Sequence, residues 1–130
     1  MRNGLLILLI GLCAAATGSH AQKSAVEGHW EIDLAPMLEQ ARSMGACARD
    51  LQQVRETFSG GRMSIEGGRI TLTIDGFAGK EVFQYKVLST QGSCSSLEIR
   101  SSNHRYCVVR DRLEVHDPRS PLIAVYKRPR

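Results

Sequence analysis

The feature that most constrains this chain is a period-two alternation of apolar residues, which begins near residue 62 and continues almost to the C-terminus. Ile70, Leu72 and Ile74 share one side of an extended segment, and Leu97 and Ile99 repeat the pattern further along. Tight-turn sequences separate these segments, at Glu66-Gly67-Gly68, Asp75-Gly76, Gln91-Gly92-Ser93, Ser102-Asn103 and Arg110-Asp111. Short alternating strands joined by tight turns predict an antiparallel meander with one apolar face.

A helical segment interrupts the strand pattern early in the chain. Apolar residues recur there every seven positions, at Met37, Met44, Leu51 and Phe58. Asp33 is a good N-cap ahead of this stripe, and the glycines at 60–61 provide a stop. We expect one long helix over about residues 34–57, with Gly45 in its middle as a weak point where it could divide.

The first 21 residues have the three-part layout of a secretory signal peptide: a basic start, an apolar run over residues 4–12 and small residues up to Ala21. The apolar run is too short for a membrane-spanning helix, which needs about 20 apolar residues. We expect cleavage after Ala21, with cleavage after Ala16 as the second choice. The mature chain is then exported, to the periplasm or as a secreted protein.

Cys13 raises a second fate for the leader, because Ile10-Gly11-Leu12-Cys13 loosely resembles the lipobox of bacterial lipoproteins. The residue before a lipidated cysteine is normally small, and Leu12 departs from that pattern. We therefore expect free export, with membrane contact only if Cys13 carries a lipid.

Removing 21 of the 130 residues leaves 109, which is enough for one domain and too few for two ordinary ones. Residues 22–27 are mainly polar and we expect them to be loose, ahead of a single β-rich domain over residues 28–130. Only 5% of the residues are aromatic, which in an exported protein argues against nucleic acid as a partner.

Basic residues gather toward the C-terminus, where residues 100–130 hold eight basic and three acidic side chains. Arg110, Arg112 and Arg119 could form a surface for an envelope protein of opposite charge. Solvated strand edges explain the same arginines, since basic side chains discourage edge-to-edge pairing of sheets.

Three cysteines remain after the expected cleavage, and an oxidising compartment favours one disulfide and one free thiol. Cys94 and Cys107 lie on adjacent expected strands and close in sequence, so we predict that they are joined. Cys47 would then be a buried thiol of the helix. A bridge from Cys47 to either of the other two, tying the helix to the sheet, stays open as the alternative.

No sequence motif of a known catalytic site occurs, whether Gly-x-Ser-x-Gly, His-Glu-x-x-His, Cys-x-x-Cys or a phosphate-binding glycine loop. His29, Glu31 and Asp33 share one strand face and could in principle hold a metal, but a metal site normally takes ligands from more than one element, and the polar face of a half-buried strand explains the same residues. His104, at an expected hairpin tip, and His116 have no neighbouring nucleophile. We expect no catalytic residue, no metal and no cofactor, and hence a protein that is not an enzyme.

Trp30, the only tryptophan, lies in the alternating segment 28–32, two residues after Gly28. A Gly-x-Trp on the first strand of an antiparallel β-barrel resembles the lipocalin signature, and the later strands resemble small bacterial lipocalin-like exported domains. The resemblance implies that Trp30 closes the barrel floor and that Gly28 allows a close approach of the backbone. One departure is the helix, which lipocalins usually carry near the end of the chain.

We therefore predict a mainly β fold, a single antiparallel meander curled into a lipocalin-like barrel with one long helix after the first strand. The alternative is an α+β, cystatin-like sheet wrapped on the helix, because that fold also begins with a strand and a helix.

A closed sheet would gather apolar side chains on one inner surface, where a small apolar ligand could bind. The residues that we expect to contact it are Trp30, Leu97, Ile99, Tyr106 and Val108. The function predicted in this way is non-enzymatic binding of a small apolar ligand. If the core is instead packed solid, the alternative is an envelope protein-binding module or inhibitor that acts through the C-terminal arginines.

Overall fold

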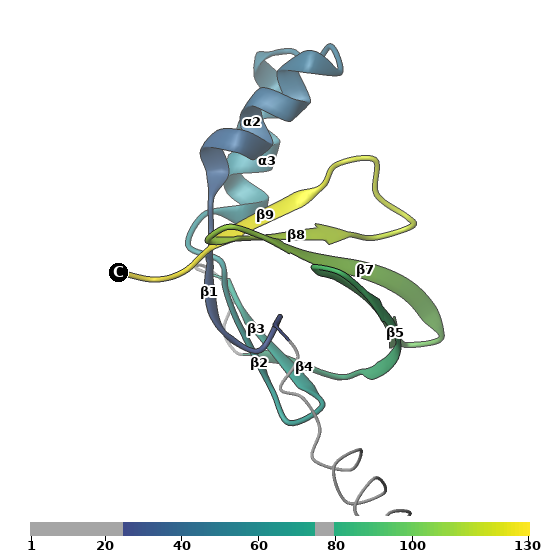
Figure 1. Ribbon diagram of the computed structural model, residues 1–130. Coiled ribbons are helices and arrows are strands. Elements are labelled where there is room, and N and C mark those ends of the chain that lie inside the picture. The colour runs from purple at the N-terminus through teal and green to yellow at the C-terminus, as the bar shows by residue number, and fades with distance from the viewer. Residues whose placement is uncertain (1–24, 75–79) are drawn as a thin grey trace, which may run out of the picture.

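The computed structural model describes residues 25–74 and 80–130 (Figure 1). The expected signal peptide, its cleavage site after Ala21 and the possible lipid site at Cys13 lie outside the described residues. Of the segment 22–27, which we expected to be loose, the structure describes residues 25–27, and Val26 among them is buried.

Nine strands in the described part of the chain form one antiparallel sheet. They are β1 (Gly28–Ile32), β2 (Arg62–Glu66), β3 (Arg69–Thr73), β4 (Lys80–Gln84), β5 (Lys86–Gln91), β6 (Cys94–Ile99), β7 (Ser102–Val109), β8 (Arg112–His116) and β9 (Ala124–Lys127). The order across the sheet is β4-β3-β2-β1-β9-β8-β7-β6-β5. The first strand therefore pairs with the last, and this pairing joins the meander β1 to β4 to the meander β5 to β9.

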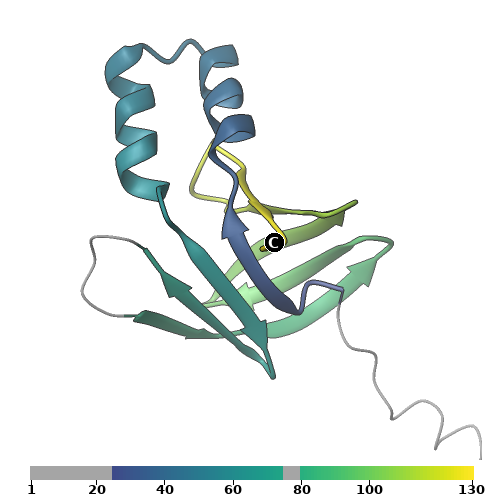
Figure 2. The ribbon, with the colours of Figure 1, turned by 90° about the vertical axis from the view of Figure 1, so that its left-hand side faces the viewer.

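Strands β4 and β5 lie at the two ends of this order, yet only Tyr85 separates them in sequence. The backbone N–H of Tyr85 donates to the carbonyl of Gly68 at 2.9 Å, which ties this point to the turn between β2 and β3. Because one continuous segment supplies both edges, the sheet curls into a nearly closed barrel (Figure 2). The prediction of a mainly β, antiparallel, barrel-like fold is confirmed.

The period-two alternation places one apolar face of the sheet inside the barrel, as predicted. The most deeply buried side chains of this core are each at most 1% exposed: Val26, Trp30, Ile65, Ile70, Leu97 and Leu113. Burying an aliphatic or aromatic side chain of this size contributes about 1.5–3 kcal/mol to folding. The core is thus the main source of stability for this small domain.

Trp30 is held at the core by contacts on two sides. Its indole N–H donates to the carbonyl of Val26 at 2.9 Å, and the guanidinium of Arg128 lies 3.7 Å from the ring centroid. Gly28 has a φ of 129°, and a Cβ there would collide with the Arg128 guanidinium. Gly28 thus permits a close approach, but the approaching group is an arginine side chain rather than backbone.

The single long helix expected over about residues 34–57 is instead two helices, α2 (Leu34–Ser43) and α3 (Ala48–Phe58). The break falls at Gly45, whose φ of 87° places it in the left-handed region. The N–H of Gly45 donates to the carbonyl of Arg42, and the N–H of Ala46 donates to that of Ala41, each at 3.0 Å. This pair of bonds is a Schellman motif, which satisfies the last carbonyls of α2 and stops it.

The two helices stand side by side beyond one end of the barrel, as both ribbon views show (Figures 1 and 2). Met37 and Ala41 of α2 are buried, whereas no residue of α3 is. The Gln40 side chain fixes α2 to the segment before β9, because it donates to the carbonyl of Ile123 at 3.0 Å and accepts from its N–H at 2.7 Å. The sheet therefore does not wrap around a helix, and the cystatin-like alternative is wrong.

Candidate functional site

A cavity of about 240 Å³ lies inside the curled sheet, between the two meanders. Apolar side chains from five strands form most of its wall, at Met63, Ile70, Leu72, Phe83, Ile99 and Val115. At about 30 Å³ for an atom of the size of water, the cavity has room for about eight non-hydrogen atoms. An apolar concave space with a few polar groups is the usual form of a small-molecule site.

The cavity occupies part of the barrel interior, and fully buried side chains that do not line it lie beside it. On β6, Ile99 lines the cavity while Leu97, two residues away, is fully buried. On β8, Val115 lines the cavity while Leu113 is fully buried. We call these two parts the cavity end and the packed end.

The remaining part of the cavity wall is polar. It is formed by two arginines, a histidine, a carboxylate and two phenols, at Arg100, Arg119, His104, Asp117, Tyr106 and Tyr126. Most of them come from the turn between β6 and β7, from β7, and from the segment after β8. The polar groups thus all come from the meander β5 to β9, whereas the apolar wall comes mainly from the meander β1 to β4, with Ile99 and Val115 from the other.

His104 is the most unusual of these groups, because its side chain is only 8% exposed and its Nε2 has no hydrogen-bond partner among the described residues. Leaving a buried polar atom without a partner costs about 1–3 kcal/mol. His104 lies two residues before Tyr106 on β7, so the two side chains lie on the same, inward face of the strand. Both residues line the cavity. An inward histidine without a partner in the chain is a candidate ligand contact.

Arg100 is placed at the cavity by a strained turn. The turn between β6 and β7 consists of Arg100 and Ser101, with φ angles of 50° and 65°, since Ile99 pairs directly with Ser102. The turn expected at Ser102-Asn103 was therefore wrong by two residues. Left-handed conformations cost non-glycine residues about 1–2 kcal/mol each, and such strain often marks functional positions.

The strained turn brings the Arg100 guanidinium over the ring of Phe83, 4.5 Å from its centroid. Phe83 lies on β4, so this contact connects the two meanders at the cavity. Arg100 forms no ion pair with any described residue. Its positive charge is therefore not compensated by a carboxylate of the described chain.

Asp117 and Arg119, by contrast, are engaged with each other. The Asp117 carboxylate accepts from the backbone N–H of Arg119 at 2.9 Å, and the Arg119 Nε lies 3.7 Å from the same oxygen. The two charges largely offset one another at this exposed position. The electrostatic character of the cavity is therefore set by Arg100, and it is positive.

Burial keeps the two tyrosine side chains of the wall, Tyr106 and Tyr126, in their neutral form, because it raises the pKa of each hydroxyl. It raises the pKa of Tyr126 to about 12. Burial also raises the pKa of Tyr106, with smaller contributions from Tyr126 and from the negative charge of Asp117. Both side chains therefore stay neutral at ordinary pH, and each offers a hydroxyl that can donate or accept a hydrogen bond.

The structure brings two of the five predicted ligand residues, Ile99 and Tyr106, to the cavity wall. Leu97 is buried in the packed end, Trp30 lies under Arg128, and Val108 packs partly buried against the core without lining the cavity. Sequence reasoning missed Arg100, His104 and Asp117. The two-residue spacing of His104 and Tyr106, which places both on the inner face of one strand, was the signal that could have found His104.

The three arginines predicted as a partner surface do not form one patch. Arg110 and Arg112 lie at the start of β8, and Arg119 follows its other end. A strand of five residues spans about 17 Å. Arg112 also pairs with Asp33, with 3.6 Å between Nε and Oδ2.

Asp33 occupies the N-cap position of α2, but its side chain makes no capping hydrogen bond. The carboxylate that we assigned to capping the helix instead pairs with Arg112.

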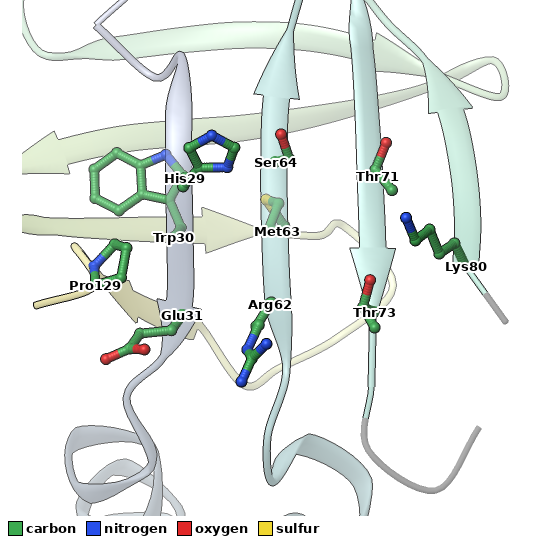
Figure 3. A pocket seen from close by; sticks show the side chains of 10 residues that line it. All are labelled: His29, Trp30, Glu31, Arg62, Met63, Ser64, Thr71, Thr73, Lys80 and Pro129. Atoms are coloured by element: carbon green, nitrogen blue, oxygen red, sulfur yellow. The ribbon is translucent and has the colours of Figure 1, made fainter. Parts of the chain in front are cut away.

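A wider hollow of about 600 Å³ lies on the outer face of β1 to β3 (Figure 3). Its polar lining residues are His29, Glu31, Arg62, Ser64, Thr71, Thr73 and Lys80. The described residues contain no group of three His, Cys, Asp or Glu side chains that could hold a metal ion. The described residues that line this hollow include no buried polar atom without a partner that could orient a ligand, so we place the candidate site in the barrel interior.

The predicted disulfide joins Cys94 of β6 to Cys107 of β7, which are directly paired across the two strands. Closing a loop of this size stabilises a domain by about 3 kcal/mol. Cys47 is free, but it is exposed. It occupies the N-cap of α3, where its backbone N–H donates to the Asp50 carboxylate. The expectation of a buried helix thiol was wrong because the helix breaks just before this residue.

In comparisons with known proteins, no family model matches this sequence, and no curated protein matches it either. Within the described residues, no helix has the length and apolar character needed to span a membrane. The function is therefore argued from the site alone.

Proposed function

We propose that this protein is an exported, non-enzymatic, lipocalin-like binding protein that holds a small, mainly apolar ligand in the cavity end of its barrel. The observation that carries this proposal is the cavity of about 240 Å³ between the two meanders, with an apolar wall and a few polar groups. The cavity is half open to solvent beside Arg100 and Arg119, so a ligand can enter it without unfolding the core.

The contrast along single strands supports binding rather than poor packing. Two residues apart on β6, Leu97 is fully buried whereas Ile99 lines the cavity. The cavity thus borders Ile99 but not its inward-facing neighbour Leu97 on the same strand.

The cavity wall also supports a non-enzymatic role. No serine, cysteine or lysine of the described chain lines it, so it lacks these three nucleophiles. Its histidine has no carboxylate or hydroxyl bonded to the buried Nε2. These groups can orient a ligand, but they do not form a nucleophile with its base.

Two observations support the remaining parts of the proposal. The Cys94–Cys107 disulfide fits an oxidising compartment, and hence the signal peptide expected at residues 1–21. Gly28 and Trp30 lie on the first strand of an antiparallel barrel, which is the context that the lipocalin resemblance requires.

Native mass spectrometry of protein purified from an oxidising export compartment tests the proposal. We expect a native mass that exceeds the denatured mass by a reproducible small-molecule increment. Leu72→Trp should remove this increment, because Leu72 lines the cavity and is only partly buried, so that the larger ring enters the free space. Val109→Trp is the matched control, since Val109 is exposed and does not line the cavity.

An increment that persists in Leu72→Trp, with the fold unchanged by circular dichroism, would place any bound molecule outside the cavity. The proposal would then be wrong.

A further inference from the structure

The polar side of the cavity carries an uncompensated positive charge. Arg100 has no ion pair with a described residue, and its guanidinium lies over the ring of Phe83. A strained turn, with positive φ at Arg100 and Ser101, holds it there. The neighbouring charges, Asp117 and Arg119, offset each other, so they do not neutralise Arg100.

A second polar group at the same cavity lacks a partner. His104 is more than nine-tenths buried, it forms part of the cavity wall, and its Nε2 bonds to no described residue. An imidazole can donate a hydrogen bond to an anionic oxygen, and a guanidinium prefers a carboxylate as its partner. Both groups therefore favour the same kind of ligand atom.

We propose that the ligand is a small amphipathic carboxylic acid, with its apolar part among Leu72, Ile99 and Val115 and its carboxylate bound by Arg100, with His104 as a further donor. This inference rests on the proposed function and specifies the ligand class. The cavity volume of about 240 Å³ fits an apolar part of about eight non-hydrogen atoms. A cationic ligand is disfavoured, because it would place a second positive charge beside Arg100.

Isothermal titration with three ligands of one chain length tests the ligand class. Octanoate, octanol and octylammonium each contain eight carbon atoms, a size that matches the cavity, and carry an anionic, a neutral and a cationic head group. We expect octanoate to bind at least tenfold more tightly than octanol, and octylammonium to bind most weakly. Equal binding of octanoate and octanol would overturn the carboxylate while leaving the cavity function intact, whereas binding of none of the three by ligand-free protein would count against both.

A pair of matched variants tests the role of Arg100. Arg100→Asn removes the guanidinium and keeps the turn, because asparagine tolerates a positive φ. Arg110→Asn is the control, since Arg110 also has a positive φ, of 59°, in a turn of the same sheet and does not line the cavity. Arg100→Asn should reduce octanoate binding at least tenfold and leave octanol binding unchanged, whereas Arg110→Asn should alter neither. Unchanged octanoate binding in Arg100→Asn, or an equal loss in both variants, would contradict the inference.

Discussion

Two parts of the barrel contain the same kind of contact, an arginine over an aromatic ring, in different surroundings. At the packed end, the Arg128 guanidinium lies 3.7 Å from the centroid of the Trp30 ring and donates to the carbonyl of Glu27. At the cavity end, the Arg100 guanidinium lies 4.5 Å from the centroid of the Phe83 ring and has no polar partner among the described residues. An arginine on an aromatic ring can thus either close a core or present an unpaired charge to a cavity.

The difference follows from the residues beneath each arginine. The Trp30 ring lies below Arg128 and is buried in the same apolar core as Leu97 and Leu113. Phe83 is smaller, lies on the edge strand β4 and borders open volume. The account therefore predicts that substitutions at the packed end affect stability, whereas those at the cavity end affect binding.

The largest expected effect is a difference in the free energy of unfolding between variants at two residues of β6. Leu97→Ala should lower the free energy of unfolding by about 3 kcal/mol, because it creates a new hole in a filled core. Ile99→Ala should cost at least about 1 kcal/mol less, since its side chain already borders free space. Urea denaturation measures both values. Equal losses at the two positions would break the distinction between the two ends.

The next prediction concerns whether water reaches the Tyr126 hydroxyl in the cavity wall. Burial raises the pKa of Tyr126 from 10.0 to about 12 in the folded protein, so folding favours the neutral phenol. The stability that this shift provides is complete below pH 10 and is lost as the pH rises toward 12, with a total of about 3 kcal/mol. Urea denaturation at several alkaline pH values should show the loss, and Tyr126→Phe should reduce it. Titration of Tyr126 near pH 10 would indicate a solvated cavity end.

A smaller difference in the free energy of unfolding is expected between variants of Arg128 and Arg100. Arg128→Ala should lower the free energy of unfolding by about 1–2 kcal/mol, because the Trp30 ring loses its cover and its cation–π contact. Arg100→Asn should change it by less than about 0.5 kcal/mol, since relief of the strained turn offsets the lost contact with Phe83. Thermal unfolding of the two variants side by side provides the comparison. A greater loss from Arg100→Asn would mean that Arg100 is mainly structural.

The smallest expected effect has the opposite sign. His104→Leu should raise the free energy of unfolding of the ligand-free protein by about 1 kcal/mol, because it removes a buried polar atom without a partner. The same variant should bind octanoate more weakly. A variant that is both less stable and unchanged in binding would show that His104 supports the fold rather than the ligand.

Much of the barrel was predictable from local pattern, because period-two alternation reports directly which face of a strand is buried. The disulfide followed from the same pattern, since Cys94 and Cys107 lie opposite each other on adjacent strands. The helix break also had a local signal in Gly45, whose left-handed conformation ends α2.

The site was less predictable, and one shifted turn accounts for part of the difficulty. Arg100-Ser101 carries none of the glycine or asparagine that normally marks a two-residue turn, so the turn was expected at Ser102-Asn103. That shift placed His104 at a hairpin tip, whereas it lies inward on β7. The cavity itself depends on how side-chain volumes from the two meanders meet, and no local pattern contains that information.

The most direct test of the account is nuclear magnetic resonance of methyl-labelled protein during a titration with octanoate. We predict that the methyl signals of Ile99 and Val115 shift in a saturable manner, whereas those of the exposed Val87 and Val109, which do not line the cavity, stay in place. Such a result would locate the ligand in the cavity. Signals at Ile99 and Val115 that do not move, or that move no more than those of Val87 and Val109, would contradict the claim that this barrel holds a small molecule between its two meanders.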